Sequence, residues 1–286
     1  MSQIQEEKKA GFPIRELSAR TQVNTVTLRA WERRYGLLKP QRSEKGHRLY
    51  SEQDVATIEK VLTLMARGVP IGKVKPLLKE DITQIEEEEV SNTWQPAVEQ
   101  LVESVEALSV TKVESQLQQT LSSYPIDIVL SRLIEPSFAA LSHKQAASAF
   151  MAFLESEVYR YVVMRLNAKV TKSKTQTSIT LICGNQAPMW RLALAALELT
   201  DLDHKVYLFA LPLTIPTAIE SLSKLNASKV VIYQDGTWKD NEEALSSKAL
   251  KESEHLLLCG TAPDISGFKQ TERVFGDLKQ LVVFFK

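Results

Sequence analysis

Arginine is concentrated in one short part of the sequence, from Thr27 to Tyr50. This stretch holds five arginines and two lysines against two glutamates, with Trp31 and Tyr35 interleaved among them. A guanidinium group can bind a phosphate or pair bidentately with guanine, and a row of such groups neutralises the phosphates of duplex DNA. An ordinary solvated helix face is the competing interpretation of so many charges. The residue types favour nucleic-acid binding, provided that the chain presents them on one surface.

Helical spacing divides the first half of this stretch into two sides. At 100° per residue, Leu28, Trp31 and Tyr35 fall on one side, which is expected to be core. The residues expected to be presented on the other side are Val26, Arg29, Ala30 and Arg33. Glu32 lies beside the core side, so we expect it to orient a neighbouring arginine rather than to contact DNA.

Cap residues predict the helices that would position these side chains. Pro13 suits the first position of a short helix, IRELSART. Asn24 can cap a second helix that runs from Thr25 to about Tyr35, and Gly36 is expected to end it. Two helices in this order, joined by a short turn, predict a helix-turn-helix.

Turn and cap residues predict a hairpin and two more helices after the second helix. Residues 37–49 are rich in glycine, proline and charge and predict a β-hairpin. Ser51 and Asp54 form a capping box before a third helix, and IGKVKPLLKE predicts a short fourth helix. The first 80 residues are therefore expected to form one small module.

Length and composition indicate a multidomain globular protein. The chain has 286 residues, of which 44% are hydrophobic and 24% charged, and a soft prior of roughly 150 residues per domain suggests two or three domains. The apolar runs are shorter than the roughly 20 residues of a membrane-spanning helix, and MSQIQEEKKA is too polar for a signal peptide. We therefore expect a cytoplasmic protein. Cys183 and Cys259 lie far apart in apolar runs, which predicts buried packing residues rather than a disulfide or a metal site.

The net charge of zero conceals an uneven distribution of charge along the chain. Residues 1–80 carry 16 basic and 9 acidic side chains, residues 81–170 carry 6 and 13, and residues 171–286 carry 13 of each. A basic N-terminal segment beside an acidic one is the asymmetry expected when one module meets a polyanion.

The sequence pattern changes twice in the rest of the chain. Residues 81–95 are expected to be a linker, and residues 96–170 have helical spacing throughout, with Thr111 and Glu114 as a capping box and Pro136 as a kink. Residues 175–286 instead alternate helices with short apolar runs, which predicts a parallel sheet of about five strands covered by helices on both faces. The runs expected to be strands are TSITLIC, KVYLFAL, KVVIY, HLLLCG and LVVFF.

An ordered series of motifs runs through residues 1–80. The motifs are Ile14-Arg15-Glu16-Leu17-Ser18, Thr27-Leu28-Arg29, Trp31-Glu32-Arg33-Arg34-Tyr35-Gly36-Leu37 and Gly46-His47-Arg48-Leu49-Tyr50. Together they resemble the MerR family of winged-helix transcription regulators. The resemblance implies an all-α winged helix-turn-helix that places one helix in the major groove of DNA and a hairpin wing on the backbone. The residues predicted to contact DNA are Arg15, Val26, Arg29, Arg33, Arg34, Arg42, His47, Arg48 and Tyr50.

Two further motifs, FLESEVYRYVVMRL and LCGTAP, extend the resemblance over most of the chain. They are similar to parts of the family's cobalamin-dependent, light-sensing repressors. This resemblance implies a four-helix bundle over 96–170 and an α/β flavodoxin-like, cobalamin-binding-like domain over 175–286.

Two positions depart from that subgroup. Its bundle helix carries a Glu-His pair above the cobalt, whereas Glu157 is followed here by Val158, and its axial histidine is replaced here by Pro188. Because the family's geometry uses imidazole as the cobalt ligand, we expect a cobalamin-independent regulator with no cofactor. A cobalamin-dependent light-sensing repressor with atypical ligation is the alternative. A corrinoid-carrying methyl-transfer subunit ranks last, because it needs the same histidine.

The C-terminal domains are therefore expected to serve oligomerisation, docking of a protein partner, or an unidentified small molecule. Ligands of open α/β sheets bind beyond the carboxyl ends of the strands. The candidate pocket residues are Asn185, Gln186, Trp190, Gln234, Asp235 and Thr261. No nucleophile elbow or phosphate-binding loop motif occurs in the sequence, so we predict no enzyme activity, no catalytic residue and no metal site. The predicted partners are a double-stranded DNA operator and further copies of the chain.

Overall fold

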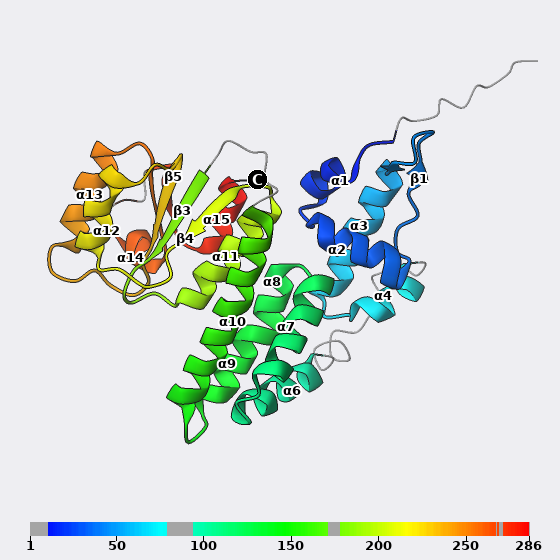
Figure 1. Ribbon diagram of the computed structural model, residues 1–286, viewed down its shortest axis with the longest axis horizontal. Helices are drawn as coiled ribbons and strands as arrows, with labels where there is room; N and C mark the ends of the chain where they lie inside the picture. The colour runs from blue at the N-terminus through cyan, green and yellow to red at the C-terminus, as the bar shows by residue number, and fades with distance from the viewer. Residues whose placement is uncertain (1–10, 79–93, 171–177, 267, 269–270, 286) are drawn as a thin grey trace, which may run out of the picture. The chain divides into compact units, whose positions relative to one another are not determined.

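The computed structural model describes the chain except for residues 1–10, 79–93, 171–177, 267, 269–270 and 286. The chain forms two compact units, Met1–Met151 and Ala152–Lys286 (Figure 1). Most of the predicted linker 81–95 lies outside the described residues, as do residues 171–177, which precede the last domain. Among the helices that the structure describes, none has the length and apolar character that crossing a lipid bilayer requires.

The first unit begins with a module of short helices and a hairpin, in the predicted order. Its described elements are α1 (Ile14–Thr21), α2 (Thr25–Ala30), η1 (Trp31–Tyr35), β1 (Gln41–Arg42), β2 (Arg48–Leu49), α3 (Glu52–Ala66) and α4 (Ile71–Leu77). The antiparallel strands β1 and β2 form the predicted hairpin.

The helix made of α2 and η1 begins and ends at the predicted residues. The Asn24 side chain accepts a hydrogen bond from the Thr27 amide at 2.8 Å. The last turn, η1, is π-helical, and Gly36 ends it with a φ of 60°, a left-handed conformation that glycine adopts without strain. Ser51 and Asp54 likewise form the predicted capping box at the start of α3.

The predicted core side of this helix is confirmed at two of three positions and is broader than expected. Leu28 and Trp31 are fully buried, whereas Tyr35 is half-buried. Ala30 was predicted to be presented to solvent, but it is buried. The helix also packs against α7 (Val110–Ser123) of the segment that follows, and this second neighbour extends the buried side to Thr27 and Ala30.

The middle of the chain is helical, as predicted. Its elements are α6 (Gln95–Glu106), α7, α8 (Ile126–Val129), η3 (Leu130–Ile134), α9 (Glu135–Ser142) and α10 (Ala147–Val170). The predicted capping box at Thr111 is wrong, because Ser109 is the cap residue and the helix has already begun at Val110. Pro136 follows the π-helical turn η3, which accommodates the proline ring and its missing amide by a local change of helical turn.

The second unit is built on a parallel five-stranded sheet. Its elements are β3 (Ser178–Cys183), α11 (Met189–Asp201), β4 (Lys205–Leu208), α12 (Ile215–Ser221), η4 (Leu222–Lys224), β5 (Lys229–Tyr233), α13 (Glu242–Glu252), β6 (Leu256–Cys259), α14 (Thr261–Ile265), β7 (Val274–Phe275) and α15 (Leu278–Phe284). The strand order β4-β3-β5-β6-β7 is the flavodoxin-like order 2-1-3-4-5. Helix α11 packs with α15 and α12 packs with α13, and the two pairs cover opposite faces (Figure 1). The predicted α/β architecture is therefore confirmed.

One predicted strand is wrong. The run LVVFF was expected to be the fifth strand, but it lies in helix α15, and the fifth strand is the short β7. Asp277 begins the helix by accepting a hydrogen bond from the Gln280 amide at 2.8 Å. Leu281 and Val282 are buried while Val283 is 57% exposed, a pattern that an apolar run without polar interruptions cannot reveal.

Candidate nucleic-acid interface

The recognition helix, Thr25–Tyr35 (α2 and η1), presents two exposed arginines one turn apart. Arg29 and Arg33 are both exposed, and the Arg33 Nε donates to the Arg29 carbonyl at 3.4 Å. Val26 lies half-buried one turn before Arg29. Because residues three and four apart share one side of a helix, these three side chains form a single row.

The wing, which is the β1–β2 hairpin with its turn, carries Arg42, His47 and Arg48. The Arg42 Nη1 donates to the Gly46 carbonyl at 3.2 Å. The His47 amide donates to Ser43 Oγ at 3.1 Å, and the Ser43 amide donates to the His47 carbonyl at 2.8 Å. These bonds close the turn and fix where the wing presents its basic side chains.

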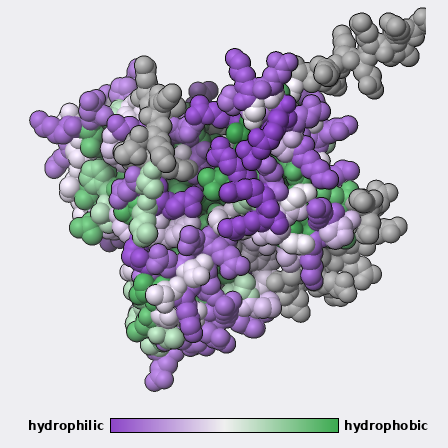
Figure 2. Space-filling view, turned by 45° about the vertical axis from the view of Figure 1, so that its right-hand side comes forward, coloured by the Kyte–Doolittle hydropathy of each residue, from purple (hydrophilic) through white to green (hydrophobic). Residues whose placement is uncertain are grey.

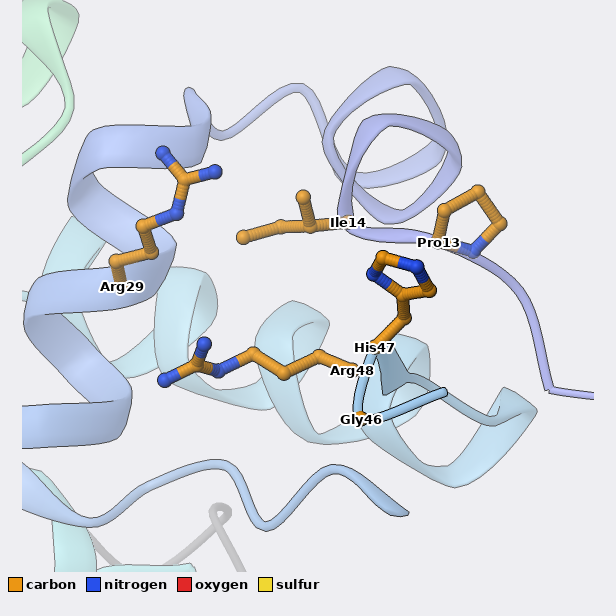
Figure 3. A pocket seen from close by; sticks show the side chains of 6 residues that line it. All are labelled: Pro13, Ile14, Arg29, Gly46, His47 and Arg48. Atoms are coloured by element: carbon orange, nitrogen blue, oxygen red, sulfur yellow. The ribbon is translucent and has the colours of Figure 1, made fainter. Parts of the chain in front are cut away.

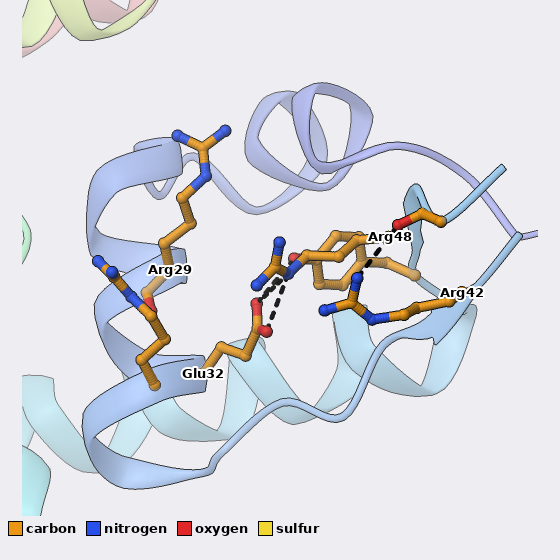
Figure 4. A network of polar contacts seen from close by, with 7 residues as sticks. Arg29, Glu32, Arg42 and Arg48 are labelled. Carbon is orange, nitrogen blue, oxygen red and sulfur yellow. Dashed lines mark hydrogen bonds and ion pairs between the residues drawn. The ribbon is translucent and has the colours of Figure 1, made fainter.

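Glu32 joins the wing to the recognition helix (Figure 4). Its carboxylate oxygens accept hydrogen bonds from the Arg48 Nε at 2.9 and 3.0 Å, and the Tyr50 hydroxyl donates to Oε2 at 3.4 Å. The hydrogen bond to Glu32 raises the pKa of Arg48, and burial raises the pKa of Tyr50 to about 12. Glu32 therefore orients a neighbouring arginine, as expected, and that arginine is Arg48.

A pocket of about 320 Å³ lies between the recognition helix, the wing and the start of α1 (Figure 3). Its lining residues are Pro13, Ile14, Arg29, Gly46, His47 and Arg48. Two guanidinium groups and an imidazole thus border one concave surface, a donor set suited to a phosphate group. The module around it presents mainly hydrophilic side chains (Figure 2). Pro13 and Ile14 also line the pocket, but the sequence did not predict them as site residues. Their position at the start of α1 is the one sequence feature that could have indicated them.

Six of the nine predicted DNA-contacting residues do not line this pocket. Val26, Arg33 and Arg42 belong to the recognition helix and the wing that border it, whereas Arg15, Arg34 and Tyr50 have different surroundings. Arg15 is exposed on α1, and the Arg34 Nη1 lies 3.4 Å from Ser123 Oγ on α7. Tyr50 is fully buried, and its hydroxyl donates to Glu32. Tyr50 therefore supports the wing from inside and offers no exposed surface to DNA.

In the second unit, two candidate ligand residues meet at the carboxyl edge of the sheet. The Thr261 amide donates to Asp235 Oδ1 at 3.0 Å, and the Gly236 amide donates to Thr261 Oγ1 at 2.7 Å. The Tyr233 hydroxyl donates to Asp235 Oδ2 at 2.5 Å, and burial together with this bond raises the pKa of Tyr233. The loops after β5 and β6 are thereby tied together.

The other four candidates differ in exposure. Asn185 is exposed and Gln186 half-buried, whereas Trp190 and Gln234 are buried. The Gln234 side chain fills the space beside Gly184, where an added Cβ would lie 1.7 Å from its Oε1. Neither polar atom of the Gln234 amide has a hydrogen-bond partner among the described residues. A buried amide therefore occupies the position between β3 and β5 where the strand order reverses.

The histidines of the second unit lie at the opposite edge of the sheet. His204 directly precedes β4 and His255 directly precedes β6, so both stand at the amino ends of parallel strands. The His204 Nε2 lies 3.0 Å from the Phe285 carbonyl, and the His255 Nδ1 lies 3.0 Å from the Ser228 carbonyl. At the carboxyl edge, Pro188 is the N-cap residue of α11. Within the described residues, no group of three or more His, Cys, Asp or Glu side chains could hold a metal ion.

A helix-turn-helix with a basic recognition helix and a basic wing defines a winged-helix DNA-binding protein. Residues 12–81 match the family model described as MerR HTH family regulatory protein. The HTH-type transcriptional regulator MlrA of Escherichia coli (strain K12) is 30% identical over 174 residues, which cover 60% of this chain and 68% of that protein. The chain belongs to the MerR family and is a DNA-binding transcriptional regulator.

Two other similarities are weaker. The HTH-type transcriptional repressor CarH of Myxococcus xanthus is 26% identical over 155 residues, which cover 50% of this chain and 51% of that protein. Among solved structures, the monomethylamine corrinoid protein of Methanosarcina barkeri aligns with a TM-score of 0.46 and 10% identity, over 66% of this chain and 97% of that one.

Proposed function

We propose that this regulator binds its operator through one face, formed by the recognition helix and the wing. Arg29 and Arg33 read base edges in the major groove, while Arg42, His47 and Arg48 bind the backbone. The observation that carries the proposal is the pocket of about 320 Å³ that gathers Arg29, His47 and Arg48. His47 and Arg48, on the wing side of this pocket, suit phosphate contacts, which release counterions and dominate affinity. Arg29, on the helix side, can reach guanine and add sequence preference.

Single substitutions separate these two roles. Arg29→Ala or Arg33→Ala should reduce the preference for the operator over scrambled DNA by about 1–3 kcal/mol per lost bidentate contact. Arg48→Ala should instead weaken binding to both sequences and flatten the dependence of affinity on salt. Gel-shift titrations of the full-length protein at two salt concentrations measure both effects. Unchanged binding in all three variants would refute the assignment.

We also propose that the second unit regulates DNA binding without cobalamin. The axial ligand of the light-sensing subgroup is an imidazole at the carboxyl edge of the sheet, and Pro188 stands at the corresponding position of this sequence. His204 and His255 stand at the amino ends of their strands, on the far side of the sheet. The residues present therefore do not fit the ligand set of the light-sensing subgroup. The roles that we propose for the second unit are therefore self-association, docking of a protein partner, or binding of another small molecule at the carboxyl edge of its sheet.

Gel filtration after mixing the purified protein with adenosylcobalamin tests this point. We expect the pigment to elute separately from the protein, in the dark and in light. Co-elution with a light-dependent change of spectrum would favour the alternative, a cobalamin-dependent repressor with atypical ligation.

We further propose that the regulator acts as a homo-oligomer. Operators of helix-turn-helix proteins are read by two or more symmetry-related subunits. Light scattering of the full-length protein with and without operator DNA measures this, and a monomer bound to the operator would contradict it.

A further inference from the structure

The recognition helix makes a second set of contacts, with the end of α7. Trp31 is fully buried, and its indole Nε1 donates to the Ser123 carbonyl at 2.7 Å. Ser123 is the last residue of α7, and the final carbonyls of a helix have no partner within that helix. Trp31 therefore supplies a donor that the end of α7 would otherwise lack.

Arg34 reinforces the same contact. Its Nη1 lies 3.4 Å from Ser123 Oγ and 3.5 Å from Ser122 Oγ. The C-terminus of a helix carries partial negative charge, so a guanidinium group is favourable there. Arg34 and Trp31 thus both contact the C-terminal end of α7.

Two more hydrogen bonds join the winged-helix module to this helical segment. The Ile71 amide, at the first residue of α4, donates to the Tyr124 hydroxyl at 3.2 Å. The Arg132 Nη2 donates at 2.5 Å to the carbonyl of Ala66, the last residue of α3. Each bond satisfies a backbone group at a helix end of the module, where no partner within the helix exists.

We propose that Tyr124 and Arg132 are positioning residues for DNA recognition. They hold the winged-helix module against the helical segment, and this contact fixes the recognition helix through Trp31. Arg29 and Arg33 are exposed in this docked arrangement and thus accessible to DNA, and in this proposal the docked state is the one that binds. A movement of the helical segment would thereby change operator affinity. The inference rests on the proposed DNA-binding face.

Tyr124→Phe tests the proposal in the full-length protein. This change removes the hydroxyl that accepts from Ile71 but keeps the ring, which packs edge-on against Trp94 at 4.7 Å between centroids. The matched control is Tyr161→Phe, because the Tyr161 hydroxyl accepts from Arg165 within helix α10. The probe is a duplex selected from a random-sequence pool by the wild-type protein, compared with a scrambled duplex of the same length.

We expect Tyr124→Phe to weaken binding to the selected duplex by about twofold to twelvefold, the range of one net hydrogen bond, with a smaller effect on the scrambled duplex. Arg132→Ala should act in the same direction, and Tyr161→Phe should change neither affinity. Circular dichroism at the assay temperature establishes that each variant is folded. A purely structural role would lower the unfolding temperature without changing the ratio of the two affinities.

Two results would overturn the proposal. An unchanged ratio in both Tyr124→Phe and Arg132→Ala would show that the docking contact does not position the helix. Tighter operator binding would show that docking holds the helix away from DNA. Arg29→Ala in the same assay separates failure of the positioning role from failure of the proposed DNA-binding face. If Arg29→Ala loses selectivity while Tyr124→Phe does not, only the positioning role fails, and if Arg29→Ala also has no effect, the proposed face fails with it.

Discussion

Replacing Glu32 by Gln should make DNA binding more dependent on salt and less selective. The Glu32 side chain is 16% exposed, and both of its oxygens accept from the Arg48 Nε, at 2.9 and 3.0 Å. The carboxylate thus neutralises one cation at the edge of the basic pocket and fixes its direction. Glutamine keeps the size of the side chain and one acceptor oxygen but removes the charge.

Counterion release sets the size of the effect. Each cation that neutralises a phosphate changes the slope of log affinity against log salt by about 0.9 in duplex DNA. In the proposed interface, Arg48 contacts the backbone in the wild type while Glu32 offsets its charge. If loss of the Glu32 charge raises the neutralisation by up to one full charge, the affinity for scrambled DNA should fall up to about 3.5-fold more than in the wild type between about 50 and 200 mM salt. The preference for the operator should decrease, because Arg48 is no longer held by two oxygens.

Fluorescence anisotropy with labelled selected and scrambled duplexes measures both quantities. Glu106→Gln is the matched control, since it removes the same charge from the ion pair with Lys144, at 3.0 Å in the helical segment. A salt dependence in Glu32→Gln equal to that of the wild type would refute the reasoning. An equal increase in Glu106→Gln would also refute it, because the effect would then reflect net charge alone.

Three further predictions concern stability and reactivity. Burial raises the pKa of Tyr50 to about 12, so the N-terminal module should lose stability as the pH rises from about 10 to about 12, in thermal unfolding of the wild type but not of Tyr50→Phe. Burial raises the pKa of Cys183 to about 12 and also raises that of Cys259, so neither thiol should react with a thiol reagent near neutral pH before unfolding, and rapid labelling of the native protein would contradict this. Gly260 has a φ of +113°, and an added Cβ would lie 2.2 Å from the Gln234 carbonyl oxygen. Gly260→Ala should destabilise the second unit by at least about 1–3 kcal/mol in calorimetry, with little change in the affinity of the winged-helix module for DNA.

Local signals predicted most of the winged-helix module. The helix caps at Asn24 and Ser51 and the end of the recognition helix at Gly36 depend on residues within a few positions of each other. The spacing of Leu28 and Trp31 depends only on the helical period. Such features depend on residues that are close in sequence, so one sequence is enough to predict them.

Long-range contacts account for the differences between the sequence-based predictions and the structure. Ala30 is buried and Arg34 lies beside Ser123 because α7, about 90 positions further along the chain, packs on the recognition helix. No periodicity within the recognition helix contains that information. The run LVVFF has the composition of a strand, but the cap at Asp277 and the packing of α15 on α11 select a helix. Tertiary packing overrides the local preference in both cases.

The polymer that this regulator binds is easier to infer than its signal, for a physical reason. Every duplex presents the same phosphates, so a row of arginines identifies DNA whatever the operator sequence. A small molecule at the carboxyl edge of a parallel sheet is instead recognised by a few loop side chains that differ for each ligand. Here that edge carries Pro188, the buried amide of Gln234 and the carboxylate of Asp235. Under the proposal that a small molecule binds at this edge, it would meet the Asp235 carboxylate and no imidazole, so the search for an effector should begin with hydrogen-bonding ligands rather than with groups that need an imidazole.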